Sequence, residues 1–407
     1  MRPVVLVLAG LLAITACAAR QAEPAPSPDL VFYASGAGIT VADGDGAVIS
    51  TASTAAGADW RRLYAVRDGE LVTLDPATSR ELAATPVPAG LTARVVSTSE
   101  DRIALTDRAA DPYSPRARTR IVVADPAGGA GQVRELDLPG NFEPEAFSAD
   151  DAHLFVLEYL PANAPVRYRV RRVELATGQV QPLLLRDKRL VPPGAEEEMR
   201  GEGRQSVLAP DRTRLYTLYL HQADHEHTRD LLPGAHADTP PVHAFVHVLS
   251  LTEGWAYCLD LPAPFGEHAA GTHAMTVSPD GTRLYVGELT TNRIAVADTG
   301  SLTVTKVATL PGARPGGDNT TMAIAPDGTT LYLGTTNLLR RVDADTLEVR
   351  DTWPTPEPVR GLALNPDGDE LLLGQPGHVT RVDATDGTVL GTFPARDLRT
   401  LYATHPR

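Results

Sequence analysis

The sequence predicts an all-β fold, a β-propeller built from four-stranded antiparallel blades. The first observation is a near-repetition late in the chain, in which a polar turn, a strand-like run and an Asp recur at a fixed offset: SPDGTRLYVGELTTNRIAVAD (278–298), APDGTTLYLGTTNLLRRVDAD (325–345) and NPDGDELLLGQPGHVTRVDAT (365–385). The second is a globular composition over 407 residues, with 43% hydrophobic residues, 34 Gly and 34 Pro. Several short strands in every 40 to 50 residues are typical of propeller blades.

Each repeat divides into four short strands. In the repeat that begins near Ala274, AMTVSPDG is a strand that ends in a turn, and TRLYVGEL, NRIAVADTG and LTVTKVATL are the second, third and fourth strands. Pro-Asp-Gly suits the first turn, because Pro presets φ, Asp bonds the nearby backbone and Gly accepts a positive φ. We therefore expect the aspartates of the repeat to cap turns and not to act as catalytic acids.

The residue that closes the third strand gives the number of blades. It recurs at Asp43, Asp75, Asp125, Glu174, Ser250, Asp298, Asp343 and Asp383. The spacings are 32, 50, 49, 76, 48, 45 and 40 residues, so the largest gap holds an insertion and the smallest lies where the repeat is weakest. Eight blades are predicted, or seven if the first two weak units form a single blade.

The two ends of the chain predict how the ring closes. The first unit, residues 30–52, has only three strands, and LRTLYATHP (398–406) adds one strand after the eighth unit. A C-terminal strand that completes the first blade would remove both free sheet edges of the ring. We therefore expect residues 30–407 to form a single propeller domain.

These repeats resemble the YVTN-type bacterial propellers, within the broad group whose blades are similar to those of quinoprotein dehydrogenases and WD repeats. The resemblance is close in Ser278–Leu310, Ala325–Trp353 and Asn365–Phe393, and it is weaker upstream. It implies the fold. It implies no activity, because the matching residues are turn and core positions.

The first residues predict export and a lipid anchor. Arg2 precedes an apolar run, Val4–Ile14, which is too short to span a membrane but suits a secretory signal. The stretch ITAC (14–17) resembles a bacterial lipobox, which implies diacylglyceryl transfer to Cys17 and cleavage after Ala16. Residues 1–16 are then a signal peptide, and residues 17–29 carry the lipid on a Pro-rich tether. The alternative is an ordinary signal peptide with a chance Cys.

These features place the chain in the cell envelope, anchored to the outer face of the bacterial cytoplasmic membrane. The second cysteine, Cys258, lies in the alternating run WAYCLDL and is predicted to be a buried small hydrophobic residue. Formal net charge is −14, with 37 basic against 51 acidic residues, so nucleic acid is not expected as a partner.

Histidines gather in one part of the sequence. Eight of the eleven lie between His221 and His273, and His221–Pro241 is predicted to be an insertion between the second and third strands of unit five, here called the 221–241 insertion. His221, His225 and His227 offer nitrogen ligands of the kind that Zn²⁺, Cu²⁺ or Ni²⁺ takes. The sequence indicates either weak transition-metal binding there or a solvated loop. His243 and His247 lie on the following strand, where one of them lines the channel or a blade surface.

Two arginine-rich segments invite a second hypothesis. Residues 107–120 carry four arginines, and 167–172 reads RYRVRR. Together they form a local basic patch for an anionic group or the membrane surface, or they lie on solvated strand faces.

Three functions fit this sequence. The first is a monomeric lipoprotein whose propeller is a binding or scaffolding platform for a protein, peptide or glycan, with no resident cofactor. The second is an enzyme that uses the central channel, such as a lactonase-like hydrolase or a metal-dependent lyase. The third is a sensor or accessory domain for metal or redox partners. Phosphate-binding loops, zinc-finger spacing, a nucleophile elbow and a haem-attachment motif are absent from the sequence, and this favours the first.

Overall fold

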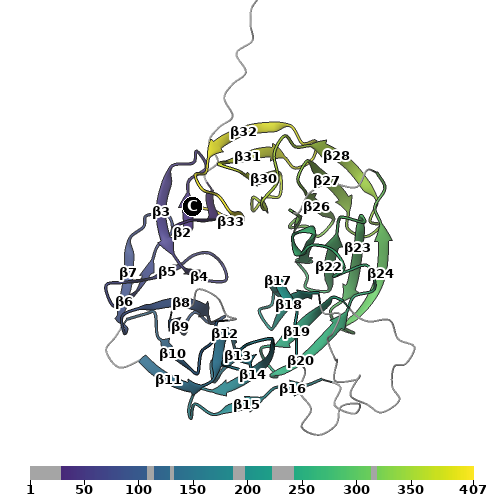
Figure 1. The fold of residues 1–407 in the computed structure, drawn as a ribbon. Coiled ribbons are helices and arrows are strands. Elements are labelled where there is room, and N and C mark those ends of the chain that lie inside the picture. Colours follow the sequence, from purple (N-terminus) through teal and green to yellow (C-terminus); the bar gives the residue numbers. More distant parts are fainter. Residues whose placement is uncertain (1–28, 108–113, 129–132, 187–197, 222–242, 313–318) are drawn as a thin grey trace, which may run out of the picture.

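Eight β-sheets surround a central channel in the computed structural model, and each sheet is one blade of a β-propeller (Figure 1). The structure describes residues 29–107, 114–128, 133–186, 198–221, 243–312 and 319–407. The prediction of an all-β propeller with eight blades is confirmed, and the alternative of seven blades is wrong. No helix in these residues is long and apolar enough to cross a membrane.

The blades follow one another along the chain, and each has its first strand next to the channel. Blades 1 to 4, from the inside outward, are β33 (Thr400–His405), β1 (Leu30–Ser35), β2 (Gly38–Ala42), β3 (Val48–Ser53); β4 (Ala55–Ala56), β5 (Leu63–Arg67), β6 (Glu70–Leu74), β7 (Glu81–Pro86); β8 (Leu91–Val96), β9 (Ile103–Asp107), β10 (Arg118–Ala124), β11 (Val133–Pro139); and β12 (Asn141–Phe147), β13 (His153–Leu160), β14 (Arg167–Glu174), β15 (Val180–Pro182).

Blades 5 to 8 are β17 (Glu202–Leu208), β18 (Arg214–Leu220), β19 (Phe245–Ser250), β20 (Trp255–Asp260); β21 (His273–Val277), β22 (Arg283–Glu288), β23 (Arg293–Asp298), β24 (Thr303–Thr309); β25 (Thr321–Ile324), β26 (Thr330–Gly334), β27 (Leu338–Asp343), β28 (Val349–Pro354); and β29 (Leu362–Leu364), β30 (Glu370–Gln375), β31 (His378–Asp383), β32 (Val389–Pro394). A two-residue strand, β16 (Leu184–Leu185), adds to β20 in parallel, and a 3-10 turn, Ala270–Thr272, precedes β21.

The turns form as the repeat predicts. Gly281, Gly328 and Gly368 have φ of +73°, +75° and +76°, values that glycine adopts at little cost. Asp280 Oδ1 accepts the backbone N–H of Thr282 at 3.0 Å, and hydrogen bonds from Ser278 and Thr282 lower the pKa of its carboxyl to about 2. The Asp298 carboxylate accepts from the backbone of Ser301 in the same way. These aspartates are turn caps.

The core lies between the blades, not within them. Eight clusters of buried apolar side chains fill the eight interfaces between neighbouring blades. Tyr285 and Tyr332, at the same position of successive repeats, are buried and reach across to the carbonyl oxygens of Ala344 and Ala384 in the next blade. Each blade is therefore stable only against its neighbours, and the ring depends on closure.

Closure is made by the C-terminal strand, as predicted. β33 pairs with β1 in antiparallel register, from Leu30 opposite His405 to Ala34 opposite Thr400. Leu398 and Leu401 are 1% and 4% exposed and pack with the apolar residues of blades 8 and 1. The last strand of the chain is thus the first strand of blade 1.

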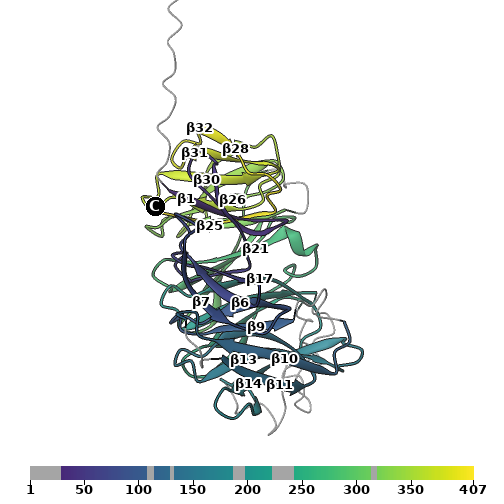
Figure 2. The ribbon, with the colours of Figure 1, turned by 90° about the vertical axis from the view of Figure 1, so that its left-hand side faces the viewer.

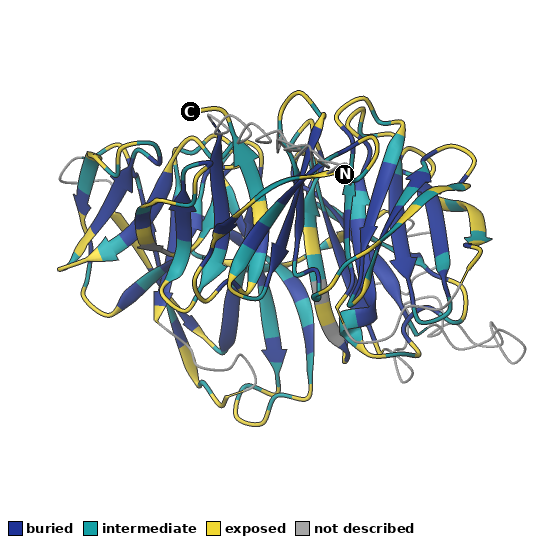
Figure 3. Ribbon diagram, turned by 90° about the horizontal axis from the view of Figure 1, so that it is seen from above, coloured by how far each residue is buried: buried dark blue, intermediate teal, exposed yellow. Residues whose placement is uncertain are grey.

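Antiparallel blades give the ring two different faces, which Figures 2 and 3 show from the side. One face, here called the connection face, carries the blade-to-blade connections and the turns between second and third strands. The other, the turn face, carries the repeated Pro-Asp-Gly turns and the turns between third and fourth strands. β1 begins and β33 ends on the turn face, since Leu30 pairs with His405. The 221–241 insertion joins β18 to β19, which places it on the connection face.

Candidate functional site

The structure describes only part of the predicted histidine site. His221 follows β18 directly, on the connection face, with a φ of +60° that starts the chain into the 221–241 insertion. His225, His227 and the predicted lipidation site Cys17 lie outside the described residues. His221 is therefore the member of this group whose surroundings define the base of the site.

Three elements bring polar side chains together around His221. Its Nε2 lies 2.8 Å from the carbonyl oxygen of His268, which belongs to the connection between β20 and β21. Because a carbonyl only accepts, Nε2 carries the proton in this contact. His268 Nδ1 in turn lies 3.6 Å from Glu288 Oε1, at the end of β22. Blades 5 and 6 thus form a chain of contacts, His221–His268–Glu288.

Glu288 is the fixed point of this cluster. Its side chain is fully buried, and its oxygens accept the backbone N–H groups of Thr290 at 2.9 Å and Thr291 at 3.0 Å, together with the Thr291 hydroxyl. Burial opposes ionisation, but hydrogen bonds from Thr291 and Thr290 outweigh it and lower the pKa of the carboxyl. A carboxylate held in this way is ionised at neutral pH and lies close to His268.

His273 has a structural role in the same cluster. It is 0% exposed, and its Nε2 accepts the backbone N–H of Gly266 at 3.0 Å. Its Nε2 lone pair is therefore occupied, and Nδ1 carries the proton beside the Ala269 carbonyl oxygen at 3.3 Å. Burial lowers the pKa of this imidazole to about 4, against the opposing pull of Glu288. His273 is neutral at neutral pH and holds the β20–β21 connection.

This burial predicts a pH dependence of stability. In the folded protein the pKa of His273 lies below the ordinary value of about 6.5. Between pH 6.5 and pH 4 the unfolded chain therefore binds a proton at this imidazole that the folded chain does not. The contribution of His273 to the free energy of unfolding is complete above pH 6.5 and is lost as the pH falls toward 4. A His273→Gln variant cannot titrate there. Between pH 7.5 and pH 4, the wild type should lose about 3 kcal/mol more free energy of unfolding than the variant, measured by urea unfolding. Equal losses would show that His273 is not a buried neutral group.

The chemistry available to the cluster is that of ligand binding. His268 Nδ1 and Glu288 Oε1 are 3.6 Å apart, which is longer than a hydrogen bond, so the carboxylate lies near the imidazole without fixing its tautomer. Among the described residues, however, no three His, Cys, Asp or Glu side chains are arranged to hold a metal ion. A complete metal site would therefore need ligands from the insertion.

Other residues that the sequence singled out lie elsewhere. His243 precedes β19. His247 lies within β19, is 3% exposed and packs edge-on against Tyr219, so neither histidine lines the channel. The channel is lined by first strands, and β19 is a third strand. Cys258 is half-buried, so the prediction of a buried cysteine is only partly correct; it packs against the cluster between blades 4 and 5.

The arginine-rich segments are paired with carboxylates. Arg118 contacts Asp137 and Arg120 contacts Glu135, both at 2.7 Å, and Arg169 contacts Glu158 at 2.8 Å. These pairs are between neighbouring strands of one blade, which is the arrangement of solvated strand faces. Arg171 shares Glu158 with Arg169, and Arg116 shares Glu143 with a third arginine, so these carboxylates offset the positive charge only in part.

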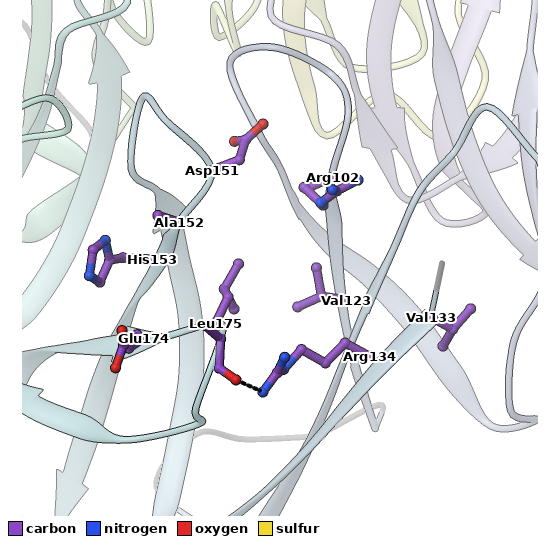
Figure 4. A pocket seen from close by; sticks show the side chains of 10 residues that line it. Arg102, Val123, Val133, Arg134, Asp151, Ala152, His153, Glu174 and Leu175 are labelled. Carbon is purple, nitrogen blue, oxygen red and sulfur yellow. Dashed lines mark hydrogen bonds between the residues drawn. The ribbon is translucent and has the colours of Figure 1, made fainter. Parts of the chain in front are cut away.

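A pocket of about 650 Å³ lies on the turn face between blades 3 and 4 (Figure 4). Arg102 and Arg134 line it from blade 3, and Asp151, His153 and Glu174 line it from blade 4. Arg134 donates to the carbonyl oxygen of Ala176 at 2.6 Å, and the Asp151 carboxylate accepts from Ser99 at 2.5 Å. Two guanidinium groups and two carboxylates balance, so this pocket favours neither anions nor cations.

Comparisons with solved structures identify the same fold. Dihydro-heme d1 dehydrogenase NirN in complex with DHE matches over 95% of this chain and 76% of its own, with a TM-score of 0.56 and 16% sequence identity. Apo AztD from Citrobacter koseri matches over 93% of this chain and 97% of its own, with a TM-score of 0.56 and 12% identity. No family model and no curated protein matches the sequence. At these identities the likeness shows the propeller fold alone.

Proposed function

We propose that this chain is a lipid-anchored binding protein of the bacterial cell envelope, which holds a protein, peptide or glycan partner on the connection face of its propeller. The observation that carries the proposal is the separation of the two faces. The chain enters the propeller on the turn face, where Leu30 pairs with His405. The His221–His268–Glu288 cluster and the start of the 221–241 insertion lie on the opposite face.

This arrangement suits an anchored protein. Residues 17–29 would span at most about 45 Å when fully extended. With lipid on Cys17, this tether keeps the turn face near the membrane and leaves the connection face open to partners. The regular turns would then face the membrane, and the longer, less regular connections would carry recognition.

Affinity capture from a solubilised envelope tests this proposal. The full-length chain serves as bait in three forms: wild type, Arg399→Glu on the connection face, and Glu348→Lys on the turn face. Both substituted residues are exposed. The same partner should be recovered by the wild type and by Glu348→Lys, and its recovery should fall about tenfold with Arg399→Glu. Equal recovery with all three baits, or loss with the turn-face variant alone, would sink the proposal.

Transition-metal binding at the 221–241 insertion is the second candidate, and the position of His268 favours it. Its Nδ1 lies 3.6 Å from the Glu288 carboxylate, and in metal sites a carboxylate commonly accepts a hydrogen bond from the second nitrogen of a ligating imidazole. His221 contacts the backbone of the same residue. We propose that His221, His225 and His227 bind Zn²⁺ or a similar ion weakly beside it.

Replacing residues 221–241 with a short Gly-Ser linker tests this metal site. The linker chain should fold normally, because β18 and β19 pair with each other without the insertion. Calorimetric titration with Zn²⁺ should show binding to the wild type at pH 7.5 that weakens at least about tenfold at pH 5.5, because imidazoles protonate near pH 6.5. The linker chain should not bind, and His153→Ala on the turn face should bind like the wild type. Undiminished binding by the linker chain would exclude the insertion as the metal site.

A further inference from the structure

A hollow of about 980 Å³ opens on the connection face beside blade 2. It is here called the blade-2 cavity, and its lining comes from residues 34–39, 54, 66, 68, 69, 89–94, 399 and 402. We propose that the blade-2 cavity binds an acidic sugar, a pyranose ring that carries a carboxylate. The inference deepens the proposed function and rests on it for the face that meets the ligand, but its test is separate.

The cavity exists because blade 2 has a very short first strand. β4 has two residues, whereas β33 and β8, the first strands of blades 1 and 3, have six each (Figure 1). The shortened strand leaves the rim of the channel unfilled between its neighbours. Eight of the eighteen lining residues are Gly or Ala, which keeps this space open. Its volume is that of ordinary small-molecule sites.

Two bulges direct side chains into this space. Tyr402 is the extra residue where β33 slips against β1, since Phe32 pairs with Ala403 and Tyr33 with Leu401. Arg94 is the extra residue where β8 slips against β9. Bulges re-aim a side chain out of the regular pleat and are frequent beside functional sites. Such bulges also interrupt β12 and β17, but the two that flank β4 both contribute to the cavity lining.

The lining carries positive charge in a chain whose net charge is −14. Arg94 donates to Glu143 at 3.0 Å, but Arg116 uses the other oxygen of the same carboxylate at 3.0 Å, so one negative charge serves two guanidinium groups. Arg399 is exposed at the rim, and among the described residues no carboxylate forms an ion pair with it. Asp68 is the one acidic residue in the lining. The excess of guanidinium groups favours a carboxylate ligand, which they bind through two parallel hydrogen bonds.

Tyr402 supplies the surface for a ring. Its side chain is 45% exposed, although it lies on the innermost strand. Trp60 stacks on it, with ring centroids 5.6 Å apart and planes at 28°, and Phe32 packs behind Trp60 at 5.0 Å. The phenol is thus held rigidly by a stack of aromatic rings. The electron-rich face of an aromatic ring attracts the C–H groups of an apolar ring face, and a pyranose presents such a face.

These features together define the ligand class. Arginine alone would favour any anion, including free phosphate, and an exposed aromatic ring alone would favour any apolar ring. Thr54 and Thr92 add hydroxyl groups to the lining that suit sugar hydroxyls. A sugar with a carboxylate would use the arginines, the aromatic ring and the hydroxyl groups together. The cavity has room for more than one sugar ring.

The probe for this site is galacturonate, titrated by calorimetry into the full-length chain. Its thirteen non-hydrogen atoms predict a dissociation constant of about 1 mM. Galactose, which lacks the carboxylate, and inorganic phosphate, which lacks the ring, should each bind at least about tenfold more weakly. Galacturonate binding should also weaken with added salt, because the arginines are at the surface.

Three variants test the lining. Arg399→Ala and Tyr402→Ala should each weaken galacturonate binding about tenfold. Gly36→Leu should abolish it, because the backbone there is not left-handed and a Cβ would meet only the Arg399 guanidinium at 3.8 Å, so the side chain fills the cavity. The matched control is Arg396→Ala, an exposed arginine three residues away that does not line the cavity. It should bind like the wild type. Thermal unfolding of each variant checks that the ring stays closed.

Other outcomes would overturn the inference. Phosphate that binds as tightly as galacturonate, with no effect of Tyr402→Ala, would make the cavity a plain anion site. No binding of galacturonate up to about 20 mM, twenty times the expected constant, would exclude an acidic sugar. If galacturonate does not bind but recovery of the partner still falls with Arg399→Glu, the sugar site is wrong and the proposed function stands. If galacturonate binds as predicted but recovery of the partner is the same with Arg399→Glu, the proposed function is wrong and the sugar site stands.

Discussion

Removing residues 398–407 should lower the melting temperature of this protein by at least about 5 °C, or prevent it from folding. The deletion takes away β33, all of its pairing with β1, and the buried side chains of Leu398 and Leu401. Loss of a buried Leu side chain costs about 2 to 5 kcal/mol, and the total is comparable to the whole stability of many domains. The edge of β1 would also be open to intermolecular pairing.

The matched control is a chain that ends at His405. It lacks only Pro406 and Arg407, which are exposed and lie beyond the strand. This chain should melt within about 1 °C of the parent, because exposed residues that lie outside strands and buried contacts contribute little to stability. If the longer truncation also melts within about 1 °C of the parent, β33 does not close the ring.

A Cys17→Ser variant should be absent from the mature membrane fraction, or should accumulate as unprocessed precursor. The thiol is the proposed acceptor of the lipid, and two acyl chains give stable anchoring where one gives only marginal binding. Cellular fractionation with immunoblotting measures the effect. The control is Cys258→Ser, which replaces the half-buried second cysteine and should leave the distribution unchanged. Normal processing and full membrane retention of the Cys17→Ser chain would contradict the anchor.

Most of the fold could be predicted because each blade repeats a local signal. Turn residues such as Asp280 and Gly281 act through their own backbone, so a short stretch of sequence is sufficient to place them. The closing positions of the third strands counted eight blades correctly, including the two weak units. The smallest spacing, 32 residues between Asp43 and Asp75, coincides with the shortened first strand of blade 2.

The sites were harder to predict because they depend on contacts between blades. His268 and Glu288 are twenty residues apart, and only the geometry of blades 5 and 6 brings them together. A partial signal existed. Glu288, Thr335 and Gln375 follow the same Gly of successive repeats, and all three are buried polar residues. The residue after this Gly differs from one repeat to the next, and it lies on the connection face. Its identity in the sequence therefore indicated which blade carries a buried carboxylate there.

The blade-2 cavity left less trace in the sequence. Tyr402 and Arg94 reach it through bulges, and a slip of one residue in pairing is decided by packing and not by the alternation of apolar residues. The role of Arg399 depends on closure, which brings the C-terminal segment beside residues 34–39. Such contacts between the two ends of a chain follow from the ring and have no local signal.

Hydrogen–deuterium exchange of the anchored protein, alone and with its captured partner, tests the central claim most directly. We predict slower exchange on binding in connection-face segments, namely residues 34–39, 66–69, 89–94 and 261–272. Exchange at the Pro-Asp-Gly turns of the turn face, residues 279–281, 326–328 and 366–368, should not change. Protection confined to those turns, with the connection-face segments exchanging as in the free protein, would contradict the assignment of the connection face as the binding surface.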